Sequence, residues 1–437
     1  MAAVKIGLLG LGTVGAGTLR LLRRSAAEIE RRTGRRLEVV WAAVRNPAKD
    51  RGDDLKGIAI TDDPWQVVRD PDIQIVVELM GGDQPAYDLI MEAIALGKHV
   101  VTANKALIAK HGNEIFAAAE RQGVAVAFEA AVAGGIPMIK AIRESLAGNR
   151  IEWLAGIING TSNYILTEMR SRGLDFQTAL AQAQQLGYAE ADPTFDIEGI
   201  DAAHKLTILA SIAFGIPLQF DKVYIEGISG ITREDIDYAW ELGFAIKHLG
   251  IAQSHAHGVA LRVHPTLVPL SRLIANVNGV MNAVLVHGDA VGDSLYYGAG
   301  AGANPTASAV VADLVDMVRL LTADPGHRVP YLGFKPQGMA DLPILPITAI
   351  ETSYYLRLSV RHHPGVMAEI TRILADESIS IEAIMQKPAV EDQPTVTVIL
   401  LTHEVLERRM NEALAKIARL PTVAGPVVRI RLENFGD

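Results

Sequence analysis

Cysteine is absent from the 437 residues of this chain, which excludes disulfide bonds, thiolate metal sites and thiol nucleophiles. Enzymes that oxidise aldehydes through a thiohemiacetal need a cysteine, so this class is excluded too. A long uninterrupted apolar segment is also lacking. The longest informative uncharged run, residues 294–312, is broken by Gly298, Gly300 and Pro305. We therefore expect a loop that enters a helix there, and no membrane span.

The chain has no excess of positive charge, since its net charge is −9. We therefore expect neither nucleic acid nor an acidic membrane as a partner. Apolar residues make up 49% and charged residues 21%, which is typical of a folded globular protein. The N-terminus shows no targeting pattern, so we expect a cytoplasmic protein.

The first region alternates short β-rich apolar runs with helical patterns. The expected strands are Val4–Leu9, Leu37–Val44, Ile73–Glu78, Lys98–Thr102 and Val124–Phe128. The expected helices are Gly15–Arg32, Pro85–Leu96 and Gly112–Gln122. Strands that alternate with helices predict a parallel sheet covered on both faces, an α/β fold of the doubly wound, Rossmann-like kind.

The rest of the chain predicts two further domains. Helical patterns such as Ile136–Leu146 and Gly199–Phe214 precede strand-like runs at Gly258–Val268 and Val280–Val286, which indicates an α+β domain with a mainly antiparallel sheet. A proline-rich linker leads to a βαββαβ tail. The predicted limits are residues 1–130 with about 305–330 for the first domain, 131–304 for the second, 331–352 for the linker and 353–437 for the tail.

A glycine motif, Gly10-Leu11-Gly12-Thr13-Val14-Gly15, directly follows the first strand and opens a helix. Gly10 permits the tight turn, Gly12 lets the backbone approach a pyrophosphate, and Gly15 permits close helix–strand packing. The helix N-terminus offers free N–H groups to the phosphates. The pattern predicts a dinucleotide site, and the alternative is a glycine-rich turn without a ligand.

The end of the second strand indicates which dinucleotide is used. An acid there binds the ribose 2′-hydroxyl, whereas an arginine accommodates a 2′-phosphate. Here Arg45 follows the strand and no acid does, which favours NADP while leaving NAD open. Alternatively, Arg45 is an ordinary solvated side chain.

Two lysines lie where chemistry is expected. Lys105 follows a strand, and ligands of open α/β sheets bind outside the carboxyl ends of strands. Lys205 follows Asp201 by four residues, so the two share one face of a helix. A lysine in a closed cleft is a candidate proton donor or acceptor, and Glu190 could bind the ammonium group of an amino acid. The alternatives are a surface lysine, and a helix salt bridge beside an acidic loop.

The segment Ala183–Lys205 resembles the signature of the homoserine dehydrogenase family. In order it has Ala, three residues, Gly, an aromatic and a small residue, then Asp-Pro, Asp, Gly-x-Asp and a Lys after three more. The resemblance extends over Gly10–Gly15, Thr102–Lys105, Glu129–Pro137 and the glycine-rich run Tyr297–Thr306. The C-terminal part is similar to an ACT regulatory domain with a ferredoxin-like fold.

This resemblance implies the reversible NAD(P)-dependent interconversion of L-homoserine and L-aspartate 4-semialdehyde, in threonine and methionine biosynthesis. By matching position, Lys205 would donate a proton to the aldehyde oxygen, and Lys105 would lie at the substrate and the nicotinamide. Glu190 and Asp201 would bind the substrate, and Asp196 would support the site. Two glycines would approach the cofactor: Gly187 and Gly302.

The resemblance also implies a monovalent cation, usually sodium. Its ligands would be Glu129 and the carbonyl groups of Val132, Gly134 and Ile136. Oxygen ligands from a bent backbone suit a hard cation. The alternative is a strand end followed by a glycine-rich helix start.

For the tail, the resemblance implies an amino-acid effector, with threonine as the expected one, and a homodimer or homotetramer. Family members often have an acidic residue two positions before the Pro-Gly pair, whereas this chain has His362 there. The alternative is a dimerising module that binds no ligand.

Two other functions remain open from the residues alone. One is a non-catalytic amino-acid sensor, against which the lysines and carboxylates argue. The other is a different amino-acid dehydrogenase, against which the whole Ala183–Lys205 pattern argues. Homoserine-dependent NADPH formation would distinguish these alternatives.

Overall fold

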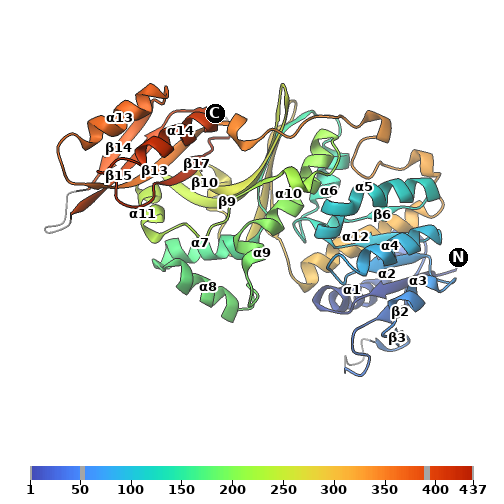
Figure 1. Cartoon of the computed structure of the whole chain (residues 1–437). Coiled ribbons are helices and arrows are strands. Elements are labelled where there is room, and N and C mark those ends of the chain that lie inside the picture. The colour runs from blue at the N-terminus through green and yellow to red at the C-terminus, as the bar shows by residue number, and fades with distance from the viewer. Residues whose placement is uncertain (1, 50–54, 388–393, 436–437) are drawn as a thin grey trace. The chain divides into compact units, whose positions relative to one another are not determined.

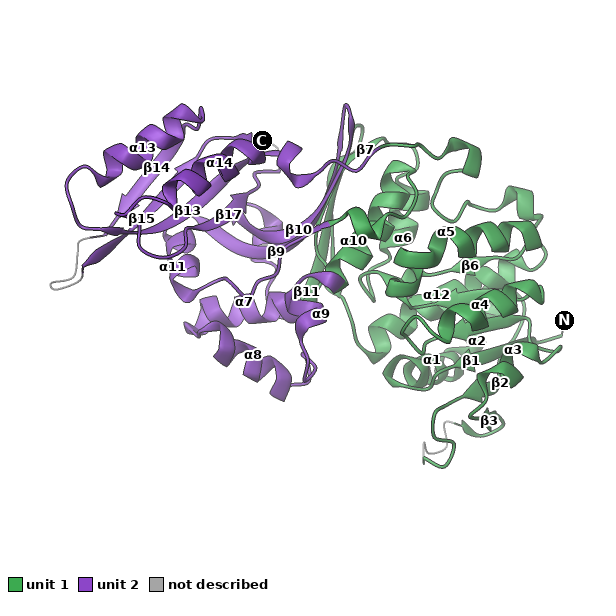
Figure 2. Cartoon of the chain, in the orientation of Figure 1, with its two compact units in different colours: residues 1–160, 201–223, 280–342 green, residues 161–200, 224–279, 343–437 purple. Residues whose placement is uncertain are grey.

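A computed structural model describes residues 2–49, 55–387 and 394–435 (Figure 1). The chain forms two compact units, each assembled from separate segments (Figure 2). Unit 1 contains residues 1–160, 201–223 and 280–342, and unit 2 contains residues 161–200, 224–279 and 343–437. The units do not mark the domain limits expected from the sequence, and those limits stay a prediction.

Unit 1 contains a six-stranded parallel sheet with the strand order β3-β2-β1-β4-β5-β6. Its strands are β1 (Val4–Leu9), β2 (Leu37–Ala43), β3 (Ala59–Thr61), β4 (Ile75–Glu78), β5 (His99–Thr102) and β6 (Val126–Ala127). The order reverses between β1 and β4, and ligands of such sheets bind at the carboxyl ends of the strands beside this reversal. The expected Rossmann-like domain is confirmed.

Helices cover both faces of this sheet. One face carries α1 (Thr13–Arg24), α2 (Ala26–Thr33) and α12 (Ala303–Leu320), and the other carries α3 (Pro64–Arg69), α4 (Ala86–Ala95) and α5 (Lys105–Gln122). Successive side chains of β1 point to opposite faces of the sheet. Ile6 and Leu8 pack with α12 on one face, whereas a Cβ at Gly7 would meet Val67 of α3 on the other face at 2.4 Å. Helix α12 is distant in sequence but packs closely on α1.

A second, antiparallel sheet in unit 1 contains β7 (Ile151–Ile157), β11 (Met281–Gly288) and β12 (Gly292–Ala299). Unit 1 also contains helix α10 (Ile200–Phe214), which comes between β7 and β11 in the sequence. It is almost entirely buried. The expectation of a loop at the start of residues 294–312 is wrong, because β12 occupies this part before α12 begins. The glycines there suggested a loop, but pairing along the whole of β11 decides the conformation.

Several expected helices have different limits. The helix expected at Gly15–Arg32 is two helices that meet at Ser25. The helix expected at Gly112–Gln122 begins earlier, at Lys105, where Asn104 caps it. The helix expected at Ile136–Leu146 is a single α-turn, α6 (Met138–Lys140), followed by a π-helical turn.

Unit 2 is built on the long antiparallel pair β9 (Phe244–His255) and β10 (Gly258–Pro269), with the short β8 (Tyr224–Ile225) beside β10. Its helices are α7 (Gly160–Arg172), α8 (Phe176–Gln185), α9 (Thr194–Ile197) and α11 (Arg233–Glu241). Strand β9 was not expected, because most of it is buried on both faces and its sequence does not alternate between apolar and polar residues.

The C-terminal part of unit 2 has the expected βαββαβ order. It comprises β13 (Glu351–Arg361), α13 (Val366–Asp376), β14 (Ile381–Gln386), β15 (Thr395–Thr402), α14 (Glu407–Ile417) and β17 (Val428–Leu432), with a two-residue β16 (Val405–Leu406). The four long strands are antiparallel in the order β17-β13-β15-β14. The described helices include none with the length and apolar character that a bilayer crossing needs.

Candidate active site

The centre of the candidate site in unit 1 is the carboxylate of Asp201, which contacts two lysines. Asp201 and Lys205 lie one turn apart on α10, and Lys205 Nζ donates to Asp201 Oδ2 at 2.6 Å. Lys105 Nζ lies 3.0 Å from the other oxygen, Oδ1. The side chain of Asp201 is 5% exposed, and those of Lys205 and Lys105 are 11% and 36% exposed. One buried carboxylate thus holds two ammonium groups.

The end of β7 supplies two further contacts. Asn159 Nδ2 donates to Asp201 Oδ2 at 2.9 Å, and Lys205 Nζ donates to the carbonyl oxygen of Ile158 at 2.7 Å. Ile158 and Asn159 are the first two residues after the strand. The positions of the carboxylate and of Lys205 are therefore fixed jointly by α10 and β7.

The charge state of Asp201 follows from these contacts. Burial by itself would raise the pKa of this carboxyl, but the ammonium groups of Lys205 and Lys105 outweigh burial and hold the pKa well below its usual range. Asp201 is therefore ionised throughout the neutral range. Its negative charge offsets part of the cost of burying Lys205.

A chain of hydrogen bonds places Lys105 at the carboxyl end of β5. The Thr102 hydroxyl donates to the buried Glu78 at 2.6 Å, and the Asn104 N–H donates to the Thr102 hydroxyl oxygen at 3.0 Å. The Asn104 side chain accepts the N–H of Leu107 and so caps α5. Lys105 is consequently the first residue of a fixed helix.

The glycine turn lies at the same edge of the sheet, after β1. Gly10 has φ +102°, and a Cβ at Gly15 would lie 2.2 Å from the Gly10 carbonyl oxygen. At Gly12, in contrast, nothing among the described residues lies within 4 Å of an added Cβ, so this side of the turn is open. Helix α1 begins at Thr13, followed by Val14, and its first turn contains no acidic residue. The turn therefore fits the approach of a phosphate group. Arg45 is exposed, two residues beyond the end of β2.

The segment expected to bind a cation is also in unit 1. The two carboxylate oxygens of Glu129 accept the N–H groups of Ile139 and Lys140 at 2.9 and 3.0 Å. Asp313, also buried, accepts the N–H of Glu129 at 2.9 Å. Burial raises the pKa of Glu129, and burial together with Glu129 raises that of Asp313 to about 8. A cation would stabilise the ionised form of these two buried carboxyl groups.

The backbone after Glu129 turns sharply. Ala133 and Gly134 have φ values of +53° and +49°, and Val132 and Ile136 flank them. A Cβ at Gly134 would lie 2.4 Å from the carbonyl oxygen of Gly300, so the two glycine-rich segments touch through their backbones. The bend is compatible with carbonyl ligands for a hard cation. Gly302, with φ +125°, precedes α12.

The other predicted site residues lie in unit 2. Gly187 has φ +74° and is exposed in the loop after α8. Glu190 is exposed in the same loop, and its carbonyl oxygen accepts the side-chain amide of Gln184 at 3.0 Å. Asp196, in α9, is half-buried, and its carbonyl oxygen accepts the Ser162 hydroxyl. The contacts thus bring together Lys105, Asp201 and Lys205, whereas Gly187, Glu190 and Asp196 belong to unit 2.

Sequence reasoning missed Asn159 and Glu78. Each lies at or just after the end of a strand and is buried, and a polar residue at that place is a usable signal in an α/β protein. The strand β7 was itself not expected, so the signal at Asn159 was lost. Metal clusters of three or more His, Asp or Glu side chains are absent from the described part of the chain.

The dinucleotide-binding sheet, the two lysines held by one carboxylate and the appended βαββαβ domain together define a nicotinamide-dependent oxidoreductase with a regulatory-type module. Residues 137–315 match the family described as homoserine dehydrogenase, residues 10–129 its NAD-binding domain, and residues 354–422 the ACT domain. The chain belongs to the homoserine dehydrogenase family.

Full-length relatives support this assignment. The chain is 62% identical to the homoserine dehydrogenase of Pseudomonas aeruginosa over 100% of both chains, and 52% identical to that of Neisseria gonorrhoeae over 100% of both. A crystal structure of a homoserine dehydrogenase from Thiobacillus denitrificans is 65% identical, with a TM-score of 0.95 over 100% of this chain and 99% of that one. The three-part fold and the enzyme class expected from the sequence are confirmed.

Replacing the carboxylate that bridges the two lysines tests how much it contributes to the stability of the folded protein. We expect Asp201→Asn to lower the free energy of unfolding at pH 7 by about 3 kcal/mol, because two ammonium groups lose their buried counter-charge. Denaturant unfolding measures this difference. The pKa of Asp201 is depressed in the folded protein, so its contribution is complete above the unfolded pKa of about 4 and is lost as the pH falls below that value.

Asp237→Asn is the matched control, because Asp237 forms an exposed i,i+4 pair with Arg233. Exposed pairs contribute about 0–1 kcal/mol, so this variant should remain close to the wild type. Equal unfolding free energies for both variants would contradict a special role for the carboxylate of Asp201.

Proposed function

We propose that the chain interconverts L-homoserine and L-aspartate 4-semialdehyde reversibly with NAD(P), as a step of threonine and methionine biosynthesis. The observation that carries this proposal is the pair of lysines on the Asp201 carboxylate, beside the carboxyl ends of strands in a nucleotide-binding sheet. The nicotinamide supplies the hydride chemistry when it is bound.

Lys205 is the proposed proton donor to the aldehyde oxygen. Its ammonium group is held by Asp201 and by the carbonyl oxygen of Ile158, so it does not need to reorganise as charge develops on the substrate oxygen. Lys105 is more exposed and would polarise the same oxygen. Asp201 would position both ammonium groups, and it retains lone pairs that can bind the substrate ammonium. The substrate and cofactor roles of Glu190, Asp196, Gly187 and Gly302 stay predictions.

NADP is the proposed cofactor, with NAD as a weaker alternative. The exposed Arg45 follows β2, where a 2′-phosphate is recognised in this fold. A hyperthermophilic archaeal homoserine dehydrogenase, 25% identical with a TM-score of 0.62 over 74% of this chain and 99% of that one, has been solved in complex with NADPH. The open backbone at Gly12 would receive the pyrophosphate.

A monovalent cation, sodium, is proposed at Glu129 and the carbonyl groups of Val132, Gly134 and Ile136. The fit rests on the buried carboxyl groups of Glu129 and Asp313 and on the left-handed turn that follows Glu129. The cation would supply positive charge to hold this turn and would take no part in the proton transfer.

The ACT domain is proposed to bind an amino-acid effector, threonine, and the enzyme is proposed to be a homodimer or homotetramer. His362 is exposed at the turn before α13, where the family often has an acid. Regulation would require threonine to bind one conformational state better than another. A cytoplasmic location stays a prediction from the sequence.

The role of Lys205 is tested by Lys205→Ala. We expect kcat for homoserine-dependent NADPH formation to fall by about 10²- to 10⁴-fold, the usual contribution of a positioned general acid or base. The dissociation constant for NADP⁺, measured by calorimetry, should change little. Lys222→Ala, at an exposed lysine of unit 1, is the control. Normal turnover by Lys205→Ala would remove this residue from the mechanism.

The role of Arg45 is tested by Arg45→Asp. We expect the ratio of kcat/KM for NADP to that for NAD to fall at least about tenfold, because a hydrogen bond to a charged group contributes about 1.5–3 kcal/mol. An unchanged ratio would show that Arg45 does not contact the 2′-phosphate.

The two proposed ligands are tested by thermal unfolding. A ligand that binds only the folded state raises the melting temperature. We expect a higher value in sodium chloride than in choline chloride of equal ionic strength, and a further rise with L-threonine but not D-threonine. No shift with sodium, or equal shifts with both enantiomers, would contradict the corresponding site.

A further inference from the structure

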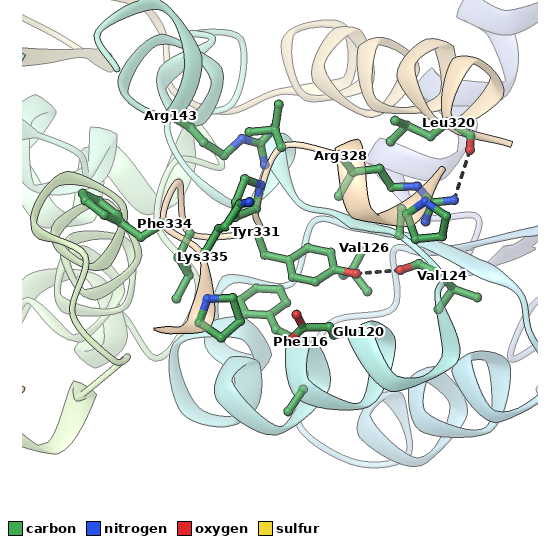
Figure 3. Close-up of a pocket in the computed structure, with 18 of the residues that line it drawn as sticks. Phe116, Glu120, Val124, Val126, Arg143, Leu320, Arg328, Tyr331, Phe334 and Lys335 are labelled. Carbon is green, nitrogen blue, oxygen red and sulfur yellow. Dashed lines mark hydrogen bonds between the residues drawn. The ribbon is translucent and has the colours of Figure 1, made fainter. Parts of the chain in front are cut away.

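Unit 1 contains a cavity of about 790 Å³ that the proposed reaction does not use (Figure 3). All the residues that line it belong to unit 1. None of them belongs to the Gly10–Gly15 turn, and Lys105, Asp201 and Lys205 are not among them. The volume lies within the range of about 300–1,000 Å³ that is usual for small-molecule sites.

The cavity lies along β6, the edge strand of the parallel sheet. Helices α5 and α12 form two of its walls, and residues 325–339 cover it. Hydrogen bonds tie this covering segment to the strand start: the Tyr331 hydroxyl donates to the carbonyl oxygen of Val124 at 2.6 Å, and Arg328 donates to that of Gly123 at 2.9 Å. The covering segment is therefore fixed over this end of the sheet.

Much of the wall is aromatic or apolar. The rings of Phe116 and Tyr331 are stacked, with centroids 5.0 Å apart and planes at 9°. Phe334 and Val329, both in the covering segment, are 39% and 48% exposed. Apolar surface that remains open to water inside a concavity is favourable for binding an apolar group.

Positive charge gathers toward one end. In Figure 3, Arg143, Phe334 and Lys335 lie toward one end of the drawn region and Arg328 toward the other, with Tyr331 between them. Arg143 uses Nε and one terminal nitrogen on the neighbouring Glu144. Lys335 is exposed and forms no ion pair with any described residue. Lys335 and the remaining terminal nitrogen of Arg143 can thus receive an anion at this end.

Four carboxylates also line the cavity, and three of them lie elsewhere or are already held by other groups. The fourth, Glu144, is at the Arg143 end and is held by Arg143, so Lys335 supplies the unbalanced positive charge there. Asp316 is paired with both Lys140 and Arg319. The Asp313 carboxyl accepts the N–H of Glu129. Glu120 lies beside Phe116, away from Arg143 (Figure 3).

We propose that this cavity is a second small-molecule site, which takes an organic carboxylate carried on an aromatic or bulky apolar group. The apolar body would pack on Tyr331 and Phe334, and the carboxylate would face Arg143 and Lys335. The lining does not include the nucleotide turn, so the ligand and the dinucleotide should not compete directly.

The proposal is tested by measuring dissociation constants calorimetrically with the full chain. The probe is 4-phenylbutyrate, and the control is its uncharged amide, 4-phenylbutyramide. We expect the carboxylate to bind at least tenfold more tightly than the amide. Saturating NADP⁺ should leave its dissociation constant unchanged. Competition between NADP⁺ and the probe would place the probe in the nucleotide site and overturn the proposal.

Two pairs of variants locate the probe. Ala117→Trp fills the cavity from an exposed position of α5 and should weaken binding at least tenfold, whereas Ala27→Trp, exposed on α2 outside the cavity, should have no effect. Lys335→Gln should weaken binding about threefold or more, and Lys222→Gln should not. Lys335 is an exposed residue outside helices and strands, so its replacement remains informative if Ala117→Trp does not fold.

The proposal is overturned if the wild type does not bind the probe, or if it binds the carboxylate and the amide equally. It is also overturned if Lys335→Gln and a folded Ala117→Trp bind the carboxylate as the wild type does. Catalytic turnover does not enter any of these measurements, so failure of the proposed dehydrogenase reaction would leave their interpretation intact.

Discussion

The buried carboxylate of Asp201 is the constraint on which the candidate active site of unit 1 depends. It must stay ionised with 5% exposure, and the two ammonium groups at 2.6 and 3.0 Å keep it so. Taking the charges of Asp201 and Lys205 out of water is costly, and it succeeds only when each charge has close partners. Asn159 and the carbonyl oxygen of Ile158 provide the remaining ones. Three elements, α10, β7 and α5, must therefore end or begin at fixed places for the charges to meet.

The parallel sheet satisfies part of this requirement through its topology. The carboxyl ends of β1, β4 and β5 lie at one edge, so the glycine turn, Glu78 and Lys105 come to the same side without any long-range signal in their local sequences. Glu78 then holds Thr102, and Thr102 holds Asn104, the cap of α5. The buried Glu78 thus helps to fix the start of α5, and with it the position of Lys105.

What could be predicted from the sequence was local or periodic. The glycine turn, the strands β1 and β2 and the four-residue spacing of Asp201 and Lys205 each follow from a short pattern. The strands β7, β9 and β12 could not be found in this way, because their pairing partners determine their conformation. Asn159 went unnoticed with β7. The contact of Lys105 with Asp201 joins residues that are far apart in sequence, so no local sequence pattern predicts it.

Unit 2 shows that the ACT domain is joined to its neighbour by more than a linker. Strand β17 pairs with β10 at Thr266 and Arg431, so the sheet of the ACT domain continues into the sheet of β9 and β10. Arg431, 1% exposed, donates to Glu407 within the ACT domain and to Glu226 beside β10, which places a buried charge network across the junction. Removing one member of such a network is costly, because a charge is left without a partner. A change in the sheet of the ACT domain would therefore reach β10 through paired backbone and through buried charge.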